Sequence, residues 1–190
     1  MPKLWNATIA THRAAVRDAI LDATVTLVAE RGLRGVTMAE VAAGAGIGRA
    51  TLYKYFGDAE AILRAWHERE IGRHLAEVGA IAEGPGAPAE QLAAALERYA
   101  VNAQAGRGGH DAELAAVLHR DEHVAAARHR LRRLLAGLIA AAAATGSVRD
   151  DVAPDELAAY ALHALGAARE LRSRGAVRRL VALTLAGLRP

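Results

Sequence analysis

One segment, residues 37–56, constrains the fold of this chain more than any other. Thr37 followed three residues later by Glu40 is a capping-box pattern, in which each side chain accepts a hydrogen bond from the other residue's backbone N–H, and it predicts that a helix begins here. Gly44 and Gly46 end that helix early, because glycine interrupts a helix and tolerates the left-handed backbone of a tight turn. A second short helix then follows to the end of the segment. The pattern therefore predicts two short helices joined by a tight turn.

Periodic apolar residues predict helices over most of the remaining chain. No strand pattern and no internal repeat is found, and alanine, the best helix former, supplies much of the 53% hydrophobic content. We predict an all-α fold of about nine helices, with a domain of three helices over residues 1–57 and a larger helical domain over residues 58–190. The predicted helices cover residues 11–31, 38–45, 48–56, 58–83, 89–105 and 111–145, the last interrupted near Arg120, followed by one helix that Pro154 begins and one after Gly175.

The net charge of +3 is unevenly distributed along the chain. Residues 1–57 hold seven Lys and Arg against four Asp and Glu, whereas residues 58–190 hold seventeen of each kind. A basic module beside a neutral one indicates a polyanionic partner for the first module alone. Because three charges is a small excess, a chance distribution stays the alternative.

Composition excludes several classes of site. The chain has no cysteine, which rules out disulfides, thiol catalysis and cysteine-ligated zinc among its residues. Residues 1–10 show no signal-peptide pattern, and the apolar stretch Leu134–Ala144 is too short for a bilayer span, which needs about 20 residues. We expect a cytoplasmic protein with no membrane segment and no cofactor.

Residues 37–56 also meet the packing requirements of a helix-turn-helix motif. The two helices cross closely, so the first needs a small residue at the crossing, and Ala42 occupies that position. Gly46 supplies the left-handed residue of the turn. The apolar residues expected to hold the crossing angle are Val41, Ala45, Ile47 and Leu52. The second helix can then enter the major groove of DNA and present its other face to the bases.

The exposed face of the second helix carries side chains suited to DNA. It consists of Arg49, Ala50, Thr51, Tyr53, Lys54 and Tyr55. An arginine can donate two hydrogen bonds to a guanine edge, and lysine, threonine and tyrosine side chains can donate to phosphate oxygens. Three alternatives stay open. Arg49 and Lys54 can be ordinary solvated charges; Tyr55 can belong partly to the core, and Thr37 can serve only as a helix cap.

At these residues the chain resembles the DNA-binding module of the TetR family of regulators. The resemblance covers residues 19–63, about a quarter of the chain, and is carried by the stretches AILDATVTLVAERG, VTMAEVAAGAGIGRATLYKYF and EAIL. The TLYxYF pattern after AGI is its most specific part. The resemblance implies a homodimer whose three N-terminal helices bind a palindromic operator in double-stranded DNA, and whose divergent helical body binds a small-molecule ligand.

The resemblance also implies roles for individual residues. Arg49 and Ala50 correspond to base-contacting positions, and Lys54 to a base- or phosphate-facing position. The positions that contact phosphate correspond to Thr37, Thr51, Tyr53 and Tyr55.

Two residues depart from the family pattern. Gly48 stands at the cap of the second helix, where Ser or Thr is usual, and glycine costs only a few tenths of a kcal/mol there. Ala59 stands where a lysine that contacts phosphate is usual. This second departure lowers the expected strength of DNA binding and leaves the module itself recognisable.

The helical body offers a candidate ligand pocket and a candidate dimer interface. Pockets combine apolar walls with a few polar groups, and the candidate pocket residues are Trp66, Tyr99, Leu135, Tyr160 and His163, with ordinary core packing as the alternative. We expect the pocket between the helices over residues 58–83, 89–105 and 110–145. A dimer through the last two helices is expected from apolar stripes too wide for a monomer surface: Leu157, Ala161, Ala164, Ala168, Val177, Leu180, Val181, Thr184, Leu185 and Leu188.

Neither a metal site nor an active site is predicted. His119 and His123 have the spacing of metal ligands on one helix face, but the many arginines around them favour a solvated face. The chain also lacks a phosphate-binding glycine motif and the paired Glu-x-x-His motifs of di-iron bundles. We predict a sequence-specific DNA-binding regulator, a repressor released by a small-molecule ligand. The alternatives are a helical DNA-binding protein without a ligand, a nonspecific architectural DNA-binding protein and a small helical enzyme.

Overall fold

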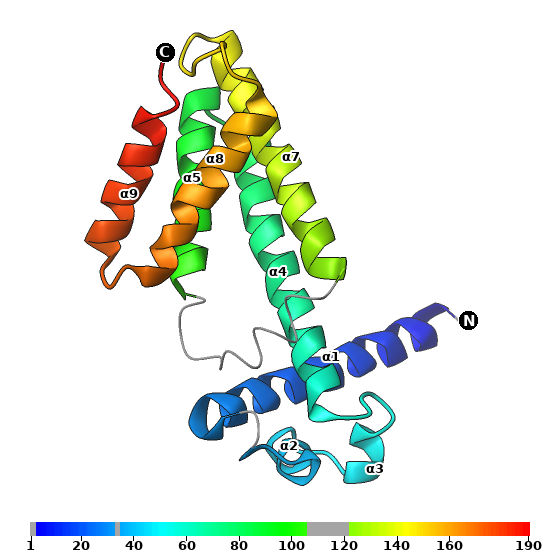
Figure 1. Ribbon diagram of the computed structural model, residues 1–190. Coiled ribbons are helices and arrows are strands. Elements are labelled where there is room, and N and C mark those ends of the chain that lie inside the picture. Colours follow the sequence, from blue (N-terminus) through cyan, green and yellow to red (C-terminus); the bar gives the residue numbers. More distant parts are fainter. Residues whose placement is uncertain (1–2, 33–34, 106–121) are drawn as a thin grey trace. The chain divides into compact units, whose positions relative to one another are not determined.

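The computed structural model describes residues 3–32, 35–105 and 122–190. These residues form eight α-helices and one short 3₁₀-helix without any β-strand, which confirms the all-α fold class (Figure 1). None of the helices in this part of the chain is long and apolar enough to cross a membrane. The elements are α1 (Lys3–Arg31), α2 (Met38–Gly44), α3 (Arg49–Leu52), α4 (Ala59–Glu83), α5 (Pro88–Ala105), α7 (Glu122–Ala144), α8 (Pro154–Gly166), η2 (Ala167–Glu170) and α9 (Arg174–Ala186).

Two sequence interpretations fall outside the described residues. The helix interruption predicted near Arg120 lies within residues 106–121, and so does His119, one member of the candidate metal pair. Among the residues that the structure does describe, no group of three or more His, Asp or Glu side chains could hold a metal ion.

The chain divides into two compact units, each with its own apolar core. The N-terminal unit includes the chain up to Glu70, and the C-terminal unit begins at Ile71. The boundary therefore falls inside α4. The sequence places this boundary between residues 57 and 58 instead. Helical periodicity does not show where along a continuous helix the packing passes from one core to another, because both parts have the same local structure.

The N-terminal unit consists of α1, α2, α3 and the first part of α4. α1 begins at Lys3, well before the predicted start at residue 11, and ends where Gly32 takes a left-handed φ of 73°. Asp58 caps α4, since its carboxylate accepts a hydrogen bond of 2.7 Å from the backbone N–H of Ala61. α1 contacts α2, and α2 contacts α3.

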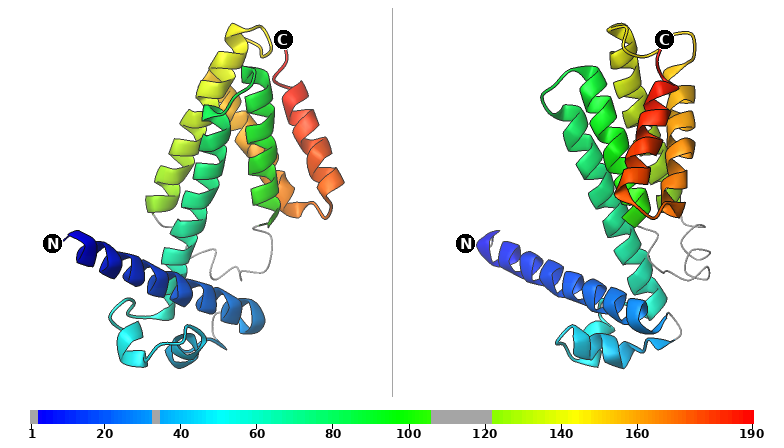
Figure 2. Two further views of the ribbon diagram at one scale, coloured as in Figure 1. Left: turned by 180° about the vertical axis from the view of Figure 1, so that it is seen from behind. Right: turned by 90° about the vertical axis from the view of Figure 1, so that its left-hand side faces the viewer.

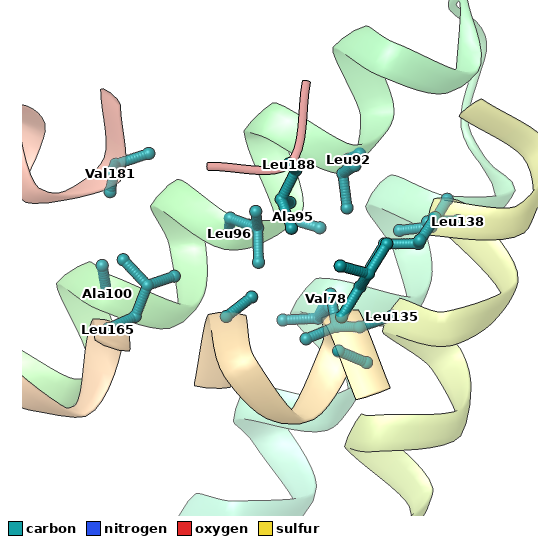
Figure 3. Packing of buried hydrophobic residues seen from close by; sticks show 14 of the residues in the cluster. Val78, Leu92, Ala95, Leu96, Ala100, Leu135, Leu138, Leu165, Val181 and Leu188 are labelled. Carbon is teal, nitrogen blue, oxygen red and sulfur yellow. The ribbon is translucent and has the colours of Figure 1, made fainter. Parts of the chain in front are cut away.

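The C-terminal unit is centred on α5, which packs against α7, α8, η2 and α9 (Figures 1 and 2). Its core is one continuous cluster of aliphatic side chains that also includes Val78 of α4 (Figure 3). Leu96 of α5, Leu135 of α7 and Leu165 of α8 are fully buried in this cluster. The backbone N–H of Arg149 donates a 2.9 Å hydrogen bond to the carbonyl of Leu188, which fixes the end of the chain beside the loop after α7.

The apolar stripes of α8 and α9 contribute to this core. Of the ten residues assigned to an interface from the sequence, the buried ones are Leu157, Ala161, Ala168, Val177, Val181, Thr184 and Leu188. The inference that these stripes are too wide for a monomer is therefore wrong, because both helices bury them against α5. The large apolar side chains that stay exposed on α8 and α9 are Tyr160 and Leu183, at 47% and 69%.

Candidate nucleic-acid interface

The predicted capping box is present at the start of α2. The hydroxyl oxygen of Thr37 accepts a hydrogen bond of 3.3 Å from the backbone N–H of Glu40, and the Glu40 carboxylate accepts one of 3.1 Å from the backbone N–H of Thr37. The Thr37 hydroxyl also donates to the same carboxylate, at 2.8 Å. Its hydrogen is thus engaged within the capping box, so a hydrogen bond from this hydroxyl to phosphate requires the contact with Glu40 to open.

An ion pair between Arg31 and Glu40 joins the end of α1 to the start of α2. The side-chain and backbone hydrogen bonds from Thr37, aided by Arg31, hold the pKa of the Glu40 carboxyl below its usual range. Charged Glu40 therefore stabilises the entry into the helix-turn-helix. The contribution of Arg31 is not visible in the sequence, because the two partners lie nine residues apart on different helices.

The crossing of α2 and α3 follows the sequence prediction closely. Ala42 is 2% exposed, and Val41 and Leu52 are fully buried beside it. Gly46 takes the left-handed φ of 66° that the turn requires. Gly44 has a second role that the sequence does not show: a Cβ added there would lie only 3.2 Å from the Cβ of Ala23 on α1. Its hydrogen side chain permits the close approach of α1 and α2.

The second helix of the motif is shorter than predicted. α3 ends at Leu52, and residues 53–55 form turns in which the backbone N–H of Tyr55 and that of Phe56 both donate to the carbonyl of Leu52, at 2.9 and 3.0 Å. Leu52 and Phe56 are buried, so they anchor both ends of this segment in the core of the N-terminal unit. Residues 49–56, called the reading segment below, thus consist of one turn of α-helix followed by turns.

The outer face of this segment consists of exposed side chains. The exposed residues are Gly48, Arg49, Ala50, Tyr53 and Lys54, and the half-buried ones are Thr51 and Tyr55. Tyr55 packs against the core of the unit, which supports the alternative that it is partly a core residue. Tyr53 is 56% exposed, a large fraction for a tyrosine in a folded unit.

Arg49 and Lys54 make no ion pair or side-chain hydrogen bond with any residue that the structure describes. Both side chains are exposed to solvent, whereas Leu52 between them is buried. Such a face can donate hydrogen bonds to phosphate oxygens or to base edges.

A cluster of charged residues that sequence reasoning did not find fixes α4 on α1. Arg69 of α4 donates to the carboxylate of Asp18 at 3.0 Å and also to that of Asp22. Both aspartates lie on α1, four residues apart and hence on one helix face. In the sequence, the only sign of this cluster is the i, i+4 spacing of the two aspartates. The sequence does not show that Arg69, which lies 51 residues after Asp18 and 47 after Asp22, pairs with both.

The five candidate pocket residues belong to two different units. Trp66 packs against the core of the N-terminal unit. Tyr99 packs against the core of the C-terminal unit, in which Leu135 is fully buried. Tyr160 and His163 lie on α8 with exposed side chains, and Nδ1 of His163 contacts the carbonyl of Ala159 at 2.8 Å.

Two family descriptions match this chain. Residues 20–66 match the bacterial regulatory proteins of the tetR family, and residues 87–190 match the C-terminal domain of SbtR-like transcriptional regulators. The second match alone covers more than half of the chain.

Individual proteins agree with these descriptions. An uncharacterised HTH-type transcriptional regulator of Mycobacterium tuberculosis is 39% identical over 88 residues, a stretch that covers 46% of this chain and 43% of that relative, so the match spans less than half of either protein. The crystal structure of a TetR transcriptional regulator from Streptomyces coelicolor is 32% identical, with a TM-score of 0.65 over 92% of this chain and 98% of the other. The regulator FadR from Bacillus subtilis, solved in complex with stearoyl-CoA, is similar in fold, with 16% identity and a TM-score of 0.62 over 90% and 98%.

The lowered pKa of Glu40 leads to a testable pH dependence. The folded-state pKa lies below the usual 4.5, so the stability that charged Glu40 contributes is complete above that pH and is lost as the pH falls through the lowered value. Glu40→Gln keeps a capping side chain without the charge. We expect the stability difference between wild type and variant to shrink as the pH falls below 4.5. Urea unfolding followed by circular dichroism over a pH series measures this difference, and a difference that stays constant over the series contradicts the role of Glu40.

Proposed function

This chain belongs to the TetR family of bacterial regulatory proteins, and we propose that it is a homodimeric repressor that binds a palindromic operator and is released by a small-molecule ligand. Members of this family are DNA-binding transcriptional regulators, not enzymes. The observation that supports the operator-binding role best is the reading segment, which buries Leu52 and leaves the cations of Arg49 and Lys54 exposed and unpaired among the described residues.

Different side chains of the reading segment have different roles in this proposal. Arg49 and Ala50 read base edges, since Arg49 stands at the start of the helix that enters the major groove. Lys54, Tyr53, Thr51 and Tyr55 hold phosphates and thereby fix the register of the protein on DNA. Thr37 contacts a phosphate once its hydroxyl turns away from Glu40, and Gly48 lets the backbone approach the DNA without a side chain between them.

The ligand-responsive part of the proposal rests on the C-terminal unit. Proteins of the TetR family bind small ligands as well as operator DNA. FadR of Bacillus subtilis, which shares this fold, was solved with stearoyl-CoA, a ligand with a long apolar chain. A mostly apolar ligand for the present chain would suit the aliphatic side chains of its core.

Tyr99 is the residue of this core most suited to contact such a ligand. It is half-buried against the apolar cluster, and burial raises the pKa of its hydroxyl, while the charges of Arg169 and Arg128 oppose that shift. The described residues give the hydroxyl no hydrogen-bond partner. A half-buried hydroxyl with two cations near it can orient the polar end of such a ligand.

The dimer in this proposal forms through the exposed faces of α8 and α9. Tyr160 lies against the end of α9, because a Cβ added at Gly187 would meet its hydroxyl at 2.7 Å. Tyr160 and Leu183 are the large apolar side chains that the two helices leave exposed. A two-fold dimer would cover both and would present two reading segments to the two halves of a palindrome.

The base-reading role of Arg49 is tested on the operator recovered by sequencing the DNA fragments that the protein retains. Arg49→Ala should cost roughly 1–3 kcal/mol of binding free energy and relax the preference at one base pair of each half-site. Lys54→Ala should lower the affinity for operator DNA and the affinity for random DNA by the same factor. Arg130→Ala, which removes an exposed cation of α7, serves as the control for net charge. If Arg49→Ala lowers the affinity for operator and random duplexes equally, Arg49 does not read a base.

The dimer is tested by sedimentation at micromolar protein concentration. The wild type should sediment as a dimer and Leu183→Asp as a monomer, because the variant places a charge in an apolar contact. Ala126→Asp, at an exposed position of α7, is the matched control and should remain dimeric. A monomeric wild type, or an unchanged Leu183→Asp, contradicts this interface.

Ligand release is tested by reciprocal titration, with stearoyl-CoA as the first probe. A ligand that releases the protein from its operator must lower operator affinity by the same factor by which the operator lowers ligand affinity. We expect both shifts in the wild type and a weaker binding of the probe by Tyr99→Phe, which removes only the hydroxyl. A probe that binds with the same affinity in the presence and absence of operator is not the inducer.

A further inference from the structure

Residues 58–190 carry no net charge, but one part of them is strongly basic. Residues 167–179, which form η2 and the start of α9, contain five arginines and a single acidic residue, Glu170. All five arginines are exposed, and none pairs with a carboxylate of the part of the chain that the structure describes. Because like charges close together repel one another, this segment is suited to an anionic partner. The five are Arg169, Arg172, Arg174, Arg178 and Arg179.

Three elements of the C-terminal unit meet where this basic segment begins. α5 packs against both η2 and α7. The side-chain amide of Gln104, in the last turn of α5, donates a 2.9 Å hydrogen bond to the carbonyl of Leu171, directly after η2. Figures 1 and 2 show the end of α5, the start of α7 and the end of α8 at the same end of this unit. Arg169 of η2 therefore lies at the end of the unit where α5 finishes and α7 starts.

On α5 and on α7, an apolar stripe continues into a polar residue toward this end. On α7, Arg128 stands three residues before Leu131 and seven before Leu135, which both pack in the aliphatic core. On α5, Tyr99 stands three residues after fully buried Leu96. Side chains at these spacings share one face of a helix. Tyr99 lies six residues before the end of α5 and Arg128 six residues after the start of α7, so each lies about 9 Å from this end of its helix.

The hydroxyl of Tyr99 lies within electrostatic reach of both cations. Burial raises the pKa of this hydroxyl, and the charges of Arg169 and Arg128 oppose that rise. Charges act over about 10 Å in ~0.1 M salt, so both guanidinium groups lie near the hydroxyl. Within the described ranges, the hydroxyl has no hydrogen-bond partner and neither arginine has an ion-pair partner. Three donors on three elements are thus left for a group that the chain does not supply.

We propose that Tyr99, Arg128 and Arg169 bind the anionic head group of an amphiphilic ligand. The inference rests on the proposed function and adds to it the charge of the ligand. Two guanidinium groups and a neutral hydroxyl can all donate hydrogen bonds to the oxygens of a carboxylate or a phosphate ester. The apolar part of the ligand follows the aliphatic cluster against which Tyr99 packs. An alcohol of the same chain length forms weaker hydrogen bonds here, because it carries no charge.

The first test compares three probes that share a chain and differ in the head group: dodecanoate, dodecyl phosphate and dodecanol. Isothermal titration calorimetry measures their affinity for the full-length protein in the absence of DNA. The wild type should bind at least one of the two anions roughly 10- to 100-fold more tightly than the alcohol, which is the effect of one hydrogen bond to a charged group. The anion that binds more tightly identifies the head group. If neither anion binds, or if both bind no more tightly than the alcohol, the proposal is wrong.

Variants of the three residues provide the second test. Arg128→Gln, Arg169→Gln and Tyr99→Phe should each bind the preferred anion roughly tenfold more weakly and bind the alcohol unchanged. Arg130→Gln is the matched control, because Arg130 is exposed on the same helix but two residues from Arg128, and hence on another face. It should bind all three probes as the wild type does. An equal loss in Arg130→Gln, or no loss in the other variants, overturns the proposal. Circular dichroism should show an unchanged fold, since the three arginines are exposed.

Operator binding separates this inference from the proposed function. If dodecanoate binds through the three residues and leaves operator affinity unchanged, ligand release by this class of ligand is wrong and the head-group site stands. If dodecanol releases the operator as effectively as dodecanoate, and Arg128→Gln does not alter the release, ligand release stands and the head-group site is wrong.

Discussion

The position of the reading segment depends on the burial of two side chains, Leu52 and Phe56. α3 has only four residues, far fewer than a helix needs to be stable in isolation. Its geometry is therefore imposed by the core of the N-terminal unit, in which Leu52 is fully buried and Phe56 is 8% exposed. Burial of these two side chains fixes the segment on the core, and Arg49, Tyr53 and Lys54 are exposed to solvent.

Close approach of the surrounding helices makes that burial possible. Ala42 at the crossing and Gly44 against Ala23 allow α1 and α2 to approach with little side-chain bulk between them. Gly46 turns the chain in a conformation that other residues adopt only with strain. Small residues in this unit are thus selected by geometry, whereas those of α5 and α8 fill a continuous aliphatic core.

Pairing of charges then determines which part of the N-terminal unit is positive. Glu40 is paired with Arg31, and Asp18 and Asp22 are paired with Arg69. Exposed pairs of this kind contribute little to stability individually. Their effect on the surface is larger, because they neutralise carboxylates that lie near the cations of α1. Among the described residues, Arg49 and Lys54 of the reading segment have no ion-pair partner, so an anionic duplex can bind there.

The sequence by itself determined the local structure of residues 37–56, since the cap at Thr37, the left-handed Gly46 and the small Ala42 each satisfy a requirement that acts over a few residues. It also determined the all-α class, because periodic apolar residues and abundant alanine leave no strand pattern. The tertiary structure alone decided what each apolar stripe packs against. It buried the stripes of α8 and α9 in their own unit, packed Trp66 and Tyr99 against different cores and brought Arg69 to two aspartates of α1. Periodicity indicates that a helix face is apolar or charged. The partner of that face depends on contacts between residues far apart in the chain, and no local sequence pattern encodes these contacts.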